Sequence, residues 1–173
     1  VSLVRINGSF GIPYIRIIEE LKEKKIPILV DIPGDRAKKK HMYVTDEELI
    51  QFAIDHKLDY VGLSYVKSAE EVIKLKERLD PFDLKVIAKI ENREGFENRE
   101  EIIKAADKIL IDRGDLGTFV GFENVPKYQI EILKSCNKLG KEVIVATEMM
   151  MSTLNSTKPN CADVSDVYFA GHH

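Results

Sequence analysis

The sequence predicts an α/β fold of parallel strands, of the (βα) TIM-barrel type but incomplete, with about six βα units. Short β-branched runs alternate with longer amphipathic stretches, which is typical of parallel strands joined by right-handed crossovers. Almost every strand-like run ends in polar residues, and barrels gather their functional groups at the carboxyl ends of many strands. A doubly wound open sheet stays open as the alternative, because periodicity alone does not separate the two architectures.

The predicted elements alternate in order along the chain. The strand-like runs are residues 3–6, 27–31, 60–64, 85–90, 108–111 and 142–146, and the helix-like stretches are residues 14–24, 45–57, 69–78, 100–105 and 126–139. Thr45 and Ser68 each precede a carboxylate three residues on, which is the capping-box pattern of a helix start. Pro126 suits a first helical turn, and Gly140 suits the end of the same helix.

Composition narrows the class of protein. The 173 residues fit one domain, and 44% hydrophobic with 32% charged residues indicates a globular chain. A net charge of −3 gives no basic field for nucleic acid, and no apolar run approaches the roughly 20 residues that span a bilayer. Cys136 and Cys161 cannot form a disulfide framework and lack metal-ligand spacing. We therefore expect a cytoplasmic protein with one domain over residues 1–170, followed by a tag remnant at 171–173.

The strongest candidate site lies at the end of the run 85–90. Lys89 and Glu91 are two positions apart, so their side chains point to one face of an extended strand. Charged residues that close an apolar parallel strand are costly unless they pair with each other or serve a site. A structural Lys–Glu pair is therefore the alternative to a functional role.

The next unit adds a second carboxylate. Asp115 follows the run 108–111, with Gly114 and Gly117 allowing close approach of the backbone to a ligand. Glu91 and Asp115, with water and substrate oxygens, would form a hard-oxygen site that suits Mg²⁺ or Mn²⁺ rather than zinc. The alternative is an ordinary turn at residues 113–117.

Polar residues also end the other strands. Arg5, Asn7 and Ser9 alternate, so they share a face if the strand continues, and Arg is the preferred fork for phosphate or carboxylate. Asp31 ends its strand in the same way. Thr147 could donate to a substrate carboxylate, with an ordinary helix N-cap as its alternative. The basic residues 36–41 form either a solvated loop or a phosphate-attracting rim.

Three segments carry a family resemblance. Residues 88–92, 113–117 and 146–149 read Ala-Lys-Ile-Glu-Asn, Arg-Gly-Asp-Leu-Gly and Ala-Thr-Glu-Met. In this order and spacing they resemble the barrel-domain signatures of the pyruvate kinase family, and segments 5–11, 31–34, 60–66 and 162–167 extend the resemblance over nearly the whole chain. The resemblance implies a barrel domain without the family's lid domain, C-terminal domain, and first and last barrel strands.

The resemblance also implies roles for the polar residues. Glu91 and Asp115 would hold the divalent metal that bridges enolpyruvate and the transferring phosphoryl group, and Lys89 would stabilise the enolate and phosphoryl charge. Arg5 would contact the phosphate, and Lys38 would contact the substrate. The substrate carboxylate would bind to the backbone N–H groups of Gly114 and Asp115 and to the Thr147 hydroxyl. A monovalent cation would be bound by Asn7, Ser9, Asp31 and the main-chain oxygen of Ile32. Thr147 would lie on the proton path to the enolate.

One departure from the family pattern concerns potassium. The family's acidic residue near the monovalent-cation site aligns with Arg36, whose positive charge would replace K⁺. The resemblance therefore implies Mg²⁺ or Mn²⁺ as the required cofactor and little dependence on K⁺.

The function implied is phosphoryl transfer between phosphoenolpyruvate and ADP, with phosphoenolpyruvate or pyruvate and ADP or ATP as small-molecule partners. A lidless enzyme acting on enolpyruvate (a tautomerase, decarboxylase or aldol lyase) is one alternative, and a non-catalytic assembly or regulatory barrel is another. The alternative that this sequence is an excerpt from a longer protein stays open as well. We expect a homo-oligomer, because open sheet edges invite pairing with another chain.

Overall fold

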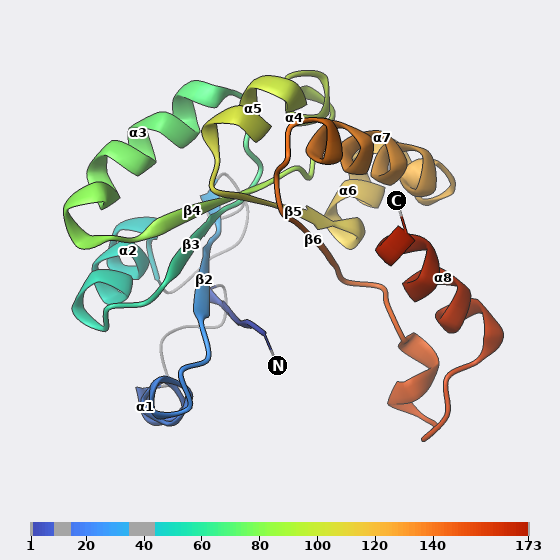
Figure 1. Cartoon of the computed structure of the whole chain (residues 1–173), viewed down its shortest axis with the longest axis horizontal. Helices are drawn as coiled ribbons and strands as arrows, with labels where there is room; N and C mark the ends of the chain where they lie inside the picture. The colour runs from blue at the N-terminus through green and yellow to red at the C-terminus, as the bar shows by residue number, and fades with distance from the viewer. Residues whose placement is uncertain (1, 9–14, 35–43, 173) are drawn as a thin grey trace.

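The computed structural model describes residues 2–8, 15–34 and 44–172, in which strands and helices alternate (Figure 1). The strands are β1 (Val4–Asn7), β2 (Ile28–Ile32), β3 (Tyr60–Leu63), β4 (Lys85–Lys89), β5 (Lys108–Asp112) and β6 (Val143–Ala146). The α-helices are α1 (Ile15–Glu23), α2 (Asp46–Asp55), α3 (Ala69–Leu79), α4 (Arg93–Glu97), α5 (Arg99–Ala105), α6 (Arg113–Val120), α7 (Val125–Lys138) and α8 (Cys161–His172), and the 3₁₀ turns are η3 (Asp80–Phe82), η4 (Phe122–Asn124) and η5 (Met151–Leu154).

The strand order identifies the architecture as an incomplete barrel. The six strands form one sheet in the order β1-β2-β3-β4-β5-β6, and every neighbouring pair is parallel. The sheet curls into a half-barrel, with α2, α3, α5 and α7 along its convex side (Figure 1). A doubly wound sheet would reverse its strand order and carry helices on both faces. The barrel-type prediction is therefore confirmed, and the open-sheet alternative is wrong.

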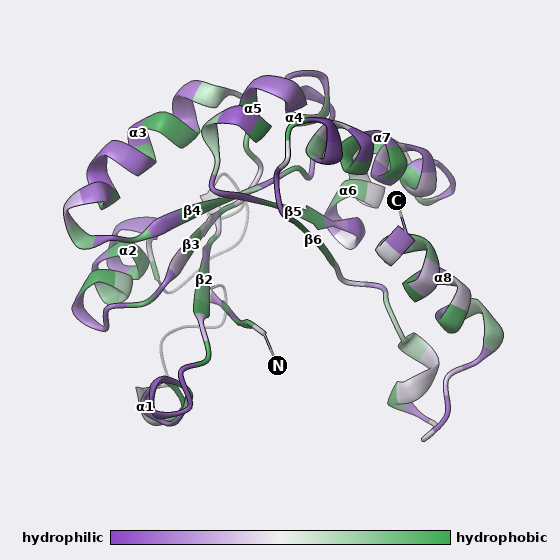
Figure 2. Cartoon of the chain, in the orientation of Figure 1, coloured by the Kyte–Doolittle hydropathy of each residue, from purple (hydrophilic) through white to green (hydrophobic). Residues whose placement is uncertain are grey.

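Side-chain alternation divides the apolar residues of the strands into two sets. One set, which includes Val30, Val61, Val86 and Ile109, packs in a large core together with helix residues. The other set faces the inside of the half-barrel and is small: Leu29, Ile87 and Leu110 are buried together, with Leu3, Tyr60, Ile144 and Ala146 packed against them. Figure 2 shows the apolar strands beside helices that alternate between apolar and polar residues. The inner face therefore has an apolar floor.

Local signals at the helix ends are partly as predicted. Thr45 forms a full capping box with Glu48 at the start of α2. Ser68 precedes α3 but its side chain makes no capping hydrogen bond, so the second predicted box is not formed. Pro126 lies in the first turn of α7, and Gly140 follows the helix with φ +63°, a conformation that favours glycine.

Three helices lie outside the predicted set: α4, α6 and α8. The first two begin directly after the strand ends that carry the candidate site, with Asn92 and Asp112 as their N-caps. Helix α8 contains no buried residue and lies at one end of the arc in Figure 1, with α1 at the other end. Within the residues that the structure describes, no helix combines the length and apolar character needed to cross a bilayer.

Candidate active site

A layer of charged side chains lies next to the apolar floor, because three of the strands each carry a charged residue two positions after an inner-face aliphatic residue. In β2, β4 and β5 the aliphatic residues Leu29, Ile87 and Leu110 are followed by Asp31, Lys89 and Asp112 respectively. These three charged residues are buried. The same alternation predicts that they converge at the carboxyl ends of the strands, where barrels carry their sites.

Lys89 is the centre of this layer. Its side chain is 2% exposed, and its Nζ lies 2.7 Å from Glu91 Oε1, 3.1 Å from Asp31 Oδ2 and 3.8 Å from Asp112 Oδ2. Nζ also donates to Ser64 Oγ at 3.1 Å. Burial acts to lower the pKa of Lys89, but the neighbouring carboxylates outweigh burial and raise this pKa above its ordinary value. The ammonium is therefore held in its charged form.

Glu91 follows β4 and is fully buried. Its Oε2 accepts the backbone N–H of Tyr65 at 2.8 Å, which fixes the carboxylate against the end of β3. Burial raises the pKa of Glu91 to about 7, although Lys89 opposes the rise. Lys89 is shared among several carboxylates, and even with Arg5 as a second cation the positive charges are fewer than the carboxylates gathered here.

Arg5 covers the layer from β1. Its Nε donates to Asp31 Oδ2 at 2.7 Å, and its Nη2 donates to Asp112 Oδ2 at 3.2 Å. The arginine side chain is 25% exposed, so part of it faces solvent above the buried carboxylates. The guanidinium thus links the first and fifth strands across the mouth of the half-barrel.

Three carboxylates lie close enough to share one cation. Glu91, Asp112 and Asp115 each offer an oxygen, and these atoms lie within 4.8 Å of one another. Asp115 is in the first turn of α6, so the ordinary-turn alternative for residues 113–117 is wrong. Asp31 Oδ1 is buried and has no hydrogen-bond partner among the described residues. Carboxylate oxygens with surplus negative charge are the donor set that Mg²⁺ and Mn²⁺ prefer.

Thr147 directly follows β6 with φ +64°, in a left-handed turn that continues through Glu148. Its hydroxyl donates to Asp112 Oδ1 at 2.9 Å and accepts the backbone N–H of Gly114 at 2.9 Å. The helix N-cap alternative for Thr147 is wrong, because the next helical segment, η5, has Met150 as its N-cap. The hydroxyl is instead aimed at the charged layer.

Arg113 holds this turn in place. Its Nε and Nη2 donate to the carbonyl oxygen of Thr147 at 3.0 and 2.8 Å, and Nη2 also donates to the carbonyl oxygen of Glu148. Its Nη1 donates to both carboxylate oxygens of Asp166 in α8 at 2.7 Å. One guanidinium therefore joins the start of α6, the turn after β6 and α8.

The predicted monovalent-cation residues are only partly within the described chain. Asn7 ends β1, and Ile32 is buried at the end of β2, beside Asp31. Ser9 lies outside the described residues, and so do Arg36, Lys38 and the rest of the basic segment 36–41. For these residues the sequence-based expectations stay predictions.

Several described residues that contact the site are absent from the predicted set, among them Ser64, Tyr65, Asp112 and Arg113. Asp112 had a sequence signal, because it follows the inner-face residue Leu110 by two positions, as Lys89 follows Ile87. Arg113 lies in the signature segment 113–117, but no local pattern indicated its contacts, since its partners lie 34, 35 and 53 residues further along the chain.

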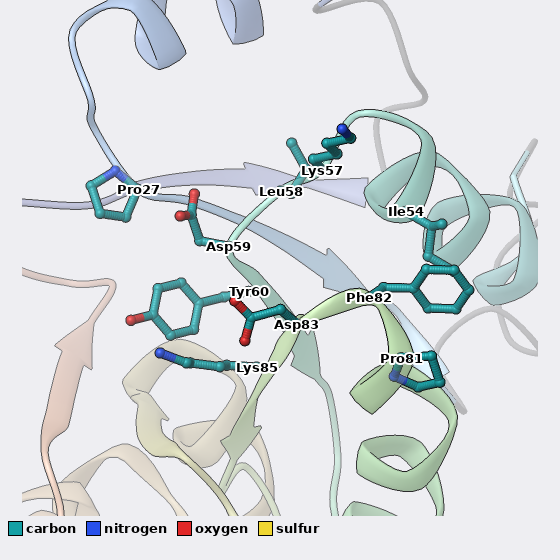
Figure 3. A pocket seen from close by; sticks show the side chains of 10 residues that line it. All are labelled: Pro27, Ile54, Lys57, Leu58, Asp59, Tyr60, Pro81, Phe82, Asp83 and Lys85. Carbon is teal, nitrogen blue, oxygen red and sulfur yellow. The ribbon is translucent and has the colours of Figure 1, made fainter.

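A hollow of about 630 Å³ lies at the opposite end of the sheet (Figure 3). It is lined by Pro27 before β2, by Tyr60 and Lys85 at the first positions of β3 and β4, and by the turns that precede these strands. The charged layer lies at the other ends of the same strands. This hollow is therefore separate from the candidate site.

The fold and the charged layer define the chain as a parallel (βα)-barrel protein with its polar site at the carboxyl ends of the strands. A family model described as "Pyruvate kinase, barrel domain" matches residues 15–171. The chain therefore belongs to the pyruvate kinase family.

Curated relatives agree with this assignment. Pyruvate kinase of Clostridium perfringens is 38% identical over 141 residues, which cover 80% of this chain and 30% of the relative. Pyruvate kinase of Geobacillus stearothermophilus is 39% identical over 150 residues, covering 85% of this chain and 25% of the relative, and that of Staphylococcus aureus strain MRSA252 is 37% identical over 150 residues, covering 86% and 25%. The chain thus spans 25–30% of the length of these relatives.

Proposed function

We propose that this chain is a pyruvate kinase-like phosphotransferase domain that binds Mg²⁺ or Mn²⁺ together with phosphoenolpyruvate or pyruvate, and that it takes part in phosphoryl transfer between phosphoenolpyruvate and ADP. The observation that carries the proposal is the convergence of the Glu91, Asp112 and Asp115 oxygens within 4.8 Å, with the buried ammonium of Lys89 2.7 Å from Glu91. Family membership makes phosphoryl transfer the first reaction to test.

The chain's own residues have distinct parts in this proposal. Glu91 and Asp115 hold the divalent cation, which when bound supplies Lewis-acid charge to substrate oxygens. Lys89 is charged and buried away from solvent, so that its ammonium would stabilise negative charge that develops on the substrate. Arg5 offers a partly exposed guanidinium to a phosphate. The Thr147 hydroxyl and the first N–H groups of α6 are the proposed donors to the substrate carboxylate.

One observation favours a second candidate, namely chemistry on enolpyruvate without a nucleotide. Only residues 33–45 join β2 to α2, whereas the family resemblance places a lid domain after β2. A lid excludes water during phosphoryl transfer, whereas proton exchange at an enolate needs no nucleotide: the metal and Lys89 would stabilise the enolate, and water reached along Thr147 would take up and return the proton. Loss of pyruvate methyl protons to D₂O, followed by NMR with Mg²⁺ and no nucleotide, would support this candidate.

The primary test is calorimetric titration of phosphoenolpyruvate into the protein with saturating Mn²⁺. We expect metal-dependent binding by the wild type and loss of that binding in Asp115→Ala. Asp55→Ala, which removes an exposed carboxylate at the far end of α2, is the matched control and should bind as the wild type does. Binding that needs no metal, or that survives in Asp115→Ala, would refute the proposed site.

Turnover is tested separately by pyruvate formation from phosphoenolpyruvate and ADP with Mg²⁺. We expect the rate to change little when K⁺ replaces Na⁺, on the hypothesis that Arg36 supplies the charge of the monovalent cation. A severalfold gain with K⁺ would contradict that hypothesis. Binding of phosphoenolpyruvate without any turnover would favour the nucleotide-free candidate.

A further inference from the structure

The carboxylate of Asp112 is surrounded by hydrogen-bond donors. Its Oδ1 accepts the Thr147 hydroxyl at 2.9 Å and, at a longer 3.4 Å, the backbone N–H of Asp115. Its Oδ2 accepts Nη2 of Arg5 at 3.2 Å and lies 3.8 Å from Nζ of Lys89. The residue is only 3% exposed. A hydroxyl, a helix N-terminal amide, a guanidinium and an ammonium thus converge on one carboxylate.

These donors overlap with those that the proposed function assigns to the ligand. The proposed ligand carboxylate needs the Thr147 hydroxyl and the N–H groups of Gly114 and Asp115. In the structure the single hydroxyl proton of Thr147 is directed at Asp112, and the Gly114 N–H is directed at the Thr147 oxygen. A hydroxyl has one proton to donate, so it cannot serve Asp112 and a ligand at once.

We propose that Asp112 is an internal occupant of the carboxylate subsite, so that a small 2-oxo or enol acid binds only when the Asp112 carboxylate leaves these donors. The inference rests on the proposed function, because that function supplies the ligand class. Asp112 thereby weakens the binding of carboxylate ligands in two ways: it occupies the hydrogen-bond donors that they need, and it places a like charge beside them.

The two effects are separable by substitution. Asp112→Asn removes the charge but keeps a side-chain oxygen that can accept from Thr147 and from the N–H of Asp115. Asp112→Ala removes both the charge and the acceptor, and so frees the donors. If occupation of the donors matters, the alanine variant binds a carboxylate more tightly than the asparagine variant does.

The experiment is a calorimetric titration of pyruvate into the wild type, Asp112→Asn and Asp112→Ala, with saturating Mn²⁺ and again without metal. We expect Asp112→Ala to bind pyruvate at least about tenfold more tightly than the wild type, as a freed charge-assisted hydrogen bond would allow, with Asp112→Asn between them. Thr45→Ala, which removes the N-cap of α2, controls for the loss of a helix cap and should match the wild type.

Asp112 is also the N-cap of α6, so folding is checked by the circular dichroism spectrum and melting temperature of each variant. If Asp112→Ala does not fold, Asp112→Gly takes its place, because glycine at an N-cap costs only a few tenths of a kcal/mol relative to a capping side chain. The same tenfold gain is expected from this variant.

Equal or weaker pyruvate binding in Asp112→Ala, with and without metal, would overturn the inference. Equal gains in Asp112→Asn and Asp112→Ala would overturn it too, because charge alone would then account for the effect. Failure of the proposed function looks different: Mn²⁺ has no effect on any variant, while the gain in Asp112→Ala without metal still supports the internal occupant.

Discussion

Replacing Lys89 with methionine tests whether the buried carboxylates depend on this one cation. Its Nζ lies 2.7 Å from Glu91 Oε1, 3.1 Å from Asp31 Oδ2 and 3.8 Å from Asp112 Oδ2. At an effective dielectric constant of about 20, each distance corresponds to roughly 4–6 kcal/mol of attraction, much of it offset by desolvation of the charges. Because removal of one partner leaves buried charge uncompensated, we expect Lys89→Met to lower the free energy of unfolding by about 3–5 kcal/mol.

Urea unfolding at a pH above 7, where the Glu91 carboxyl with its pKa of about 7 is ionised, followed by circular dichroism, measures this loss. Domains are stable by only about 5–15 kcal/mol, so the urea midpoint should fall substantially while the slope of free energy against urea stays the same. The matched control is Lys76→Met. Lys76 Nζ lies 2.6 Å from Asp107 Oδ1, but the lysine side chain is 38% exposed. Because solvent screens this pair, we expect its loss to cost less than about 1 kcal/mol.

A second substitution sharpens the test. Adding Glu91→Gln to Lys89→Met removes one of the carboxylates that the lysine compensates, so the double variant should be more stable than the sum of the two single losses predicts. The reasoning is refuted if Lys89→Met costs no more than Lys76→Met. It is also refuted if the two losses at the buried pair simply add.

Three further predictions concern other parts of the fold. Gly62→Ala would place a Cβ 2.4 Å from Asp31 Oδ1, so we expect a loss of about 1–3 kcal/mol in urea unfolding, and a wild-type midpoint would contradict the close approach. Thr45→Ala removes a formed capping box and should cost about 1 kcal/mol by the same measurement; no loss would mean that the box contributes nothing. Burial raises the pKa of Cys136 to about 12, so iodoacetamide at neutral pH should alkylate the exposed Cys161 first, and mass spectrometry that finds Cys136 modified in the native protein would contradict this.

Much of the fold could be predicted from the sequence, because apolar residues recur with different periods in strands and in helices. Each predicted strand overlaps an observed one. The two-residue period places Asp31 on the same face as Leu29 and Lys89 on the same face as Ile87, and the structure shows that this is the inner face. Among the residue patterns, only the polar strand ends favoured the incomplete barrel over the open sheet. The family resemblance also implied a barrel, and the observed strand order agrees with it. Helix α8 gave no clear periodic signal, since it buries no residue against the rest of the chain.

The parts of the site that escaped prediction depend on contacts between distant residues. Threonine rarely adopts a positive φ, so no local pattern at residue 147 indicated a left-handed turn. The turn is held by Arg113, which donates to the carbonyl oxygens of Thr147 and Glu148 from the start of α6. The face of the strand on which the Asp112 side chain lies could be predicted from its spacing to Leu110. Its role as an acceptor for Arg5 could not, because Arg5 is 107 positions away in the sequence.

The spacing between the apolar floor and the charged layer has a consequence for how this chain can change over evolution. A substitution at Asp31, Lys89 or Asp112 alters one group and leaves the others in register. Deleting or inserting one residue within β2, β4 or β5 would instead exchange a charge for an aliphatic side chain at the strand end and turn the charge toward the helices. We therefore expect natural variants to keep the lengths of these strands and to accept insertions in the segments that join them.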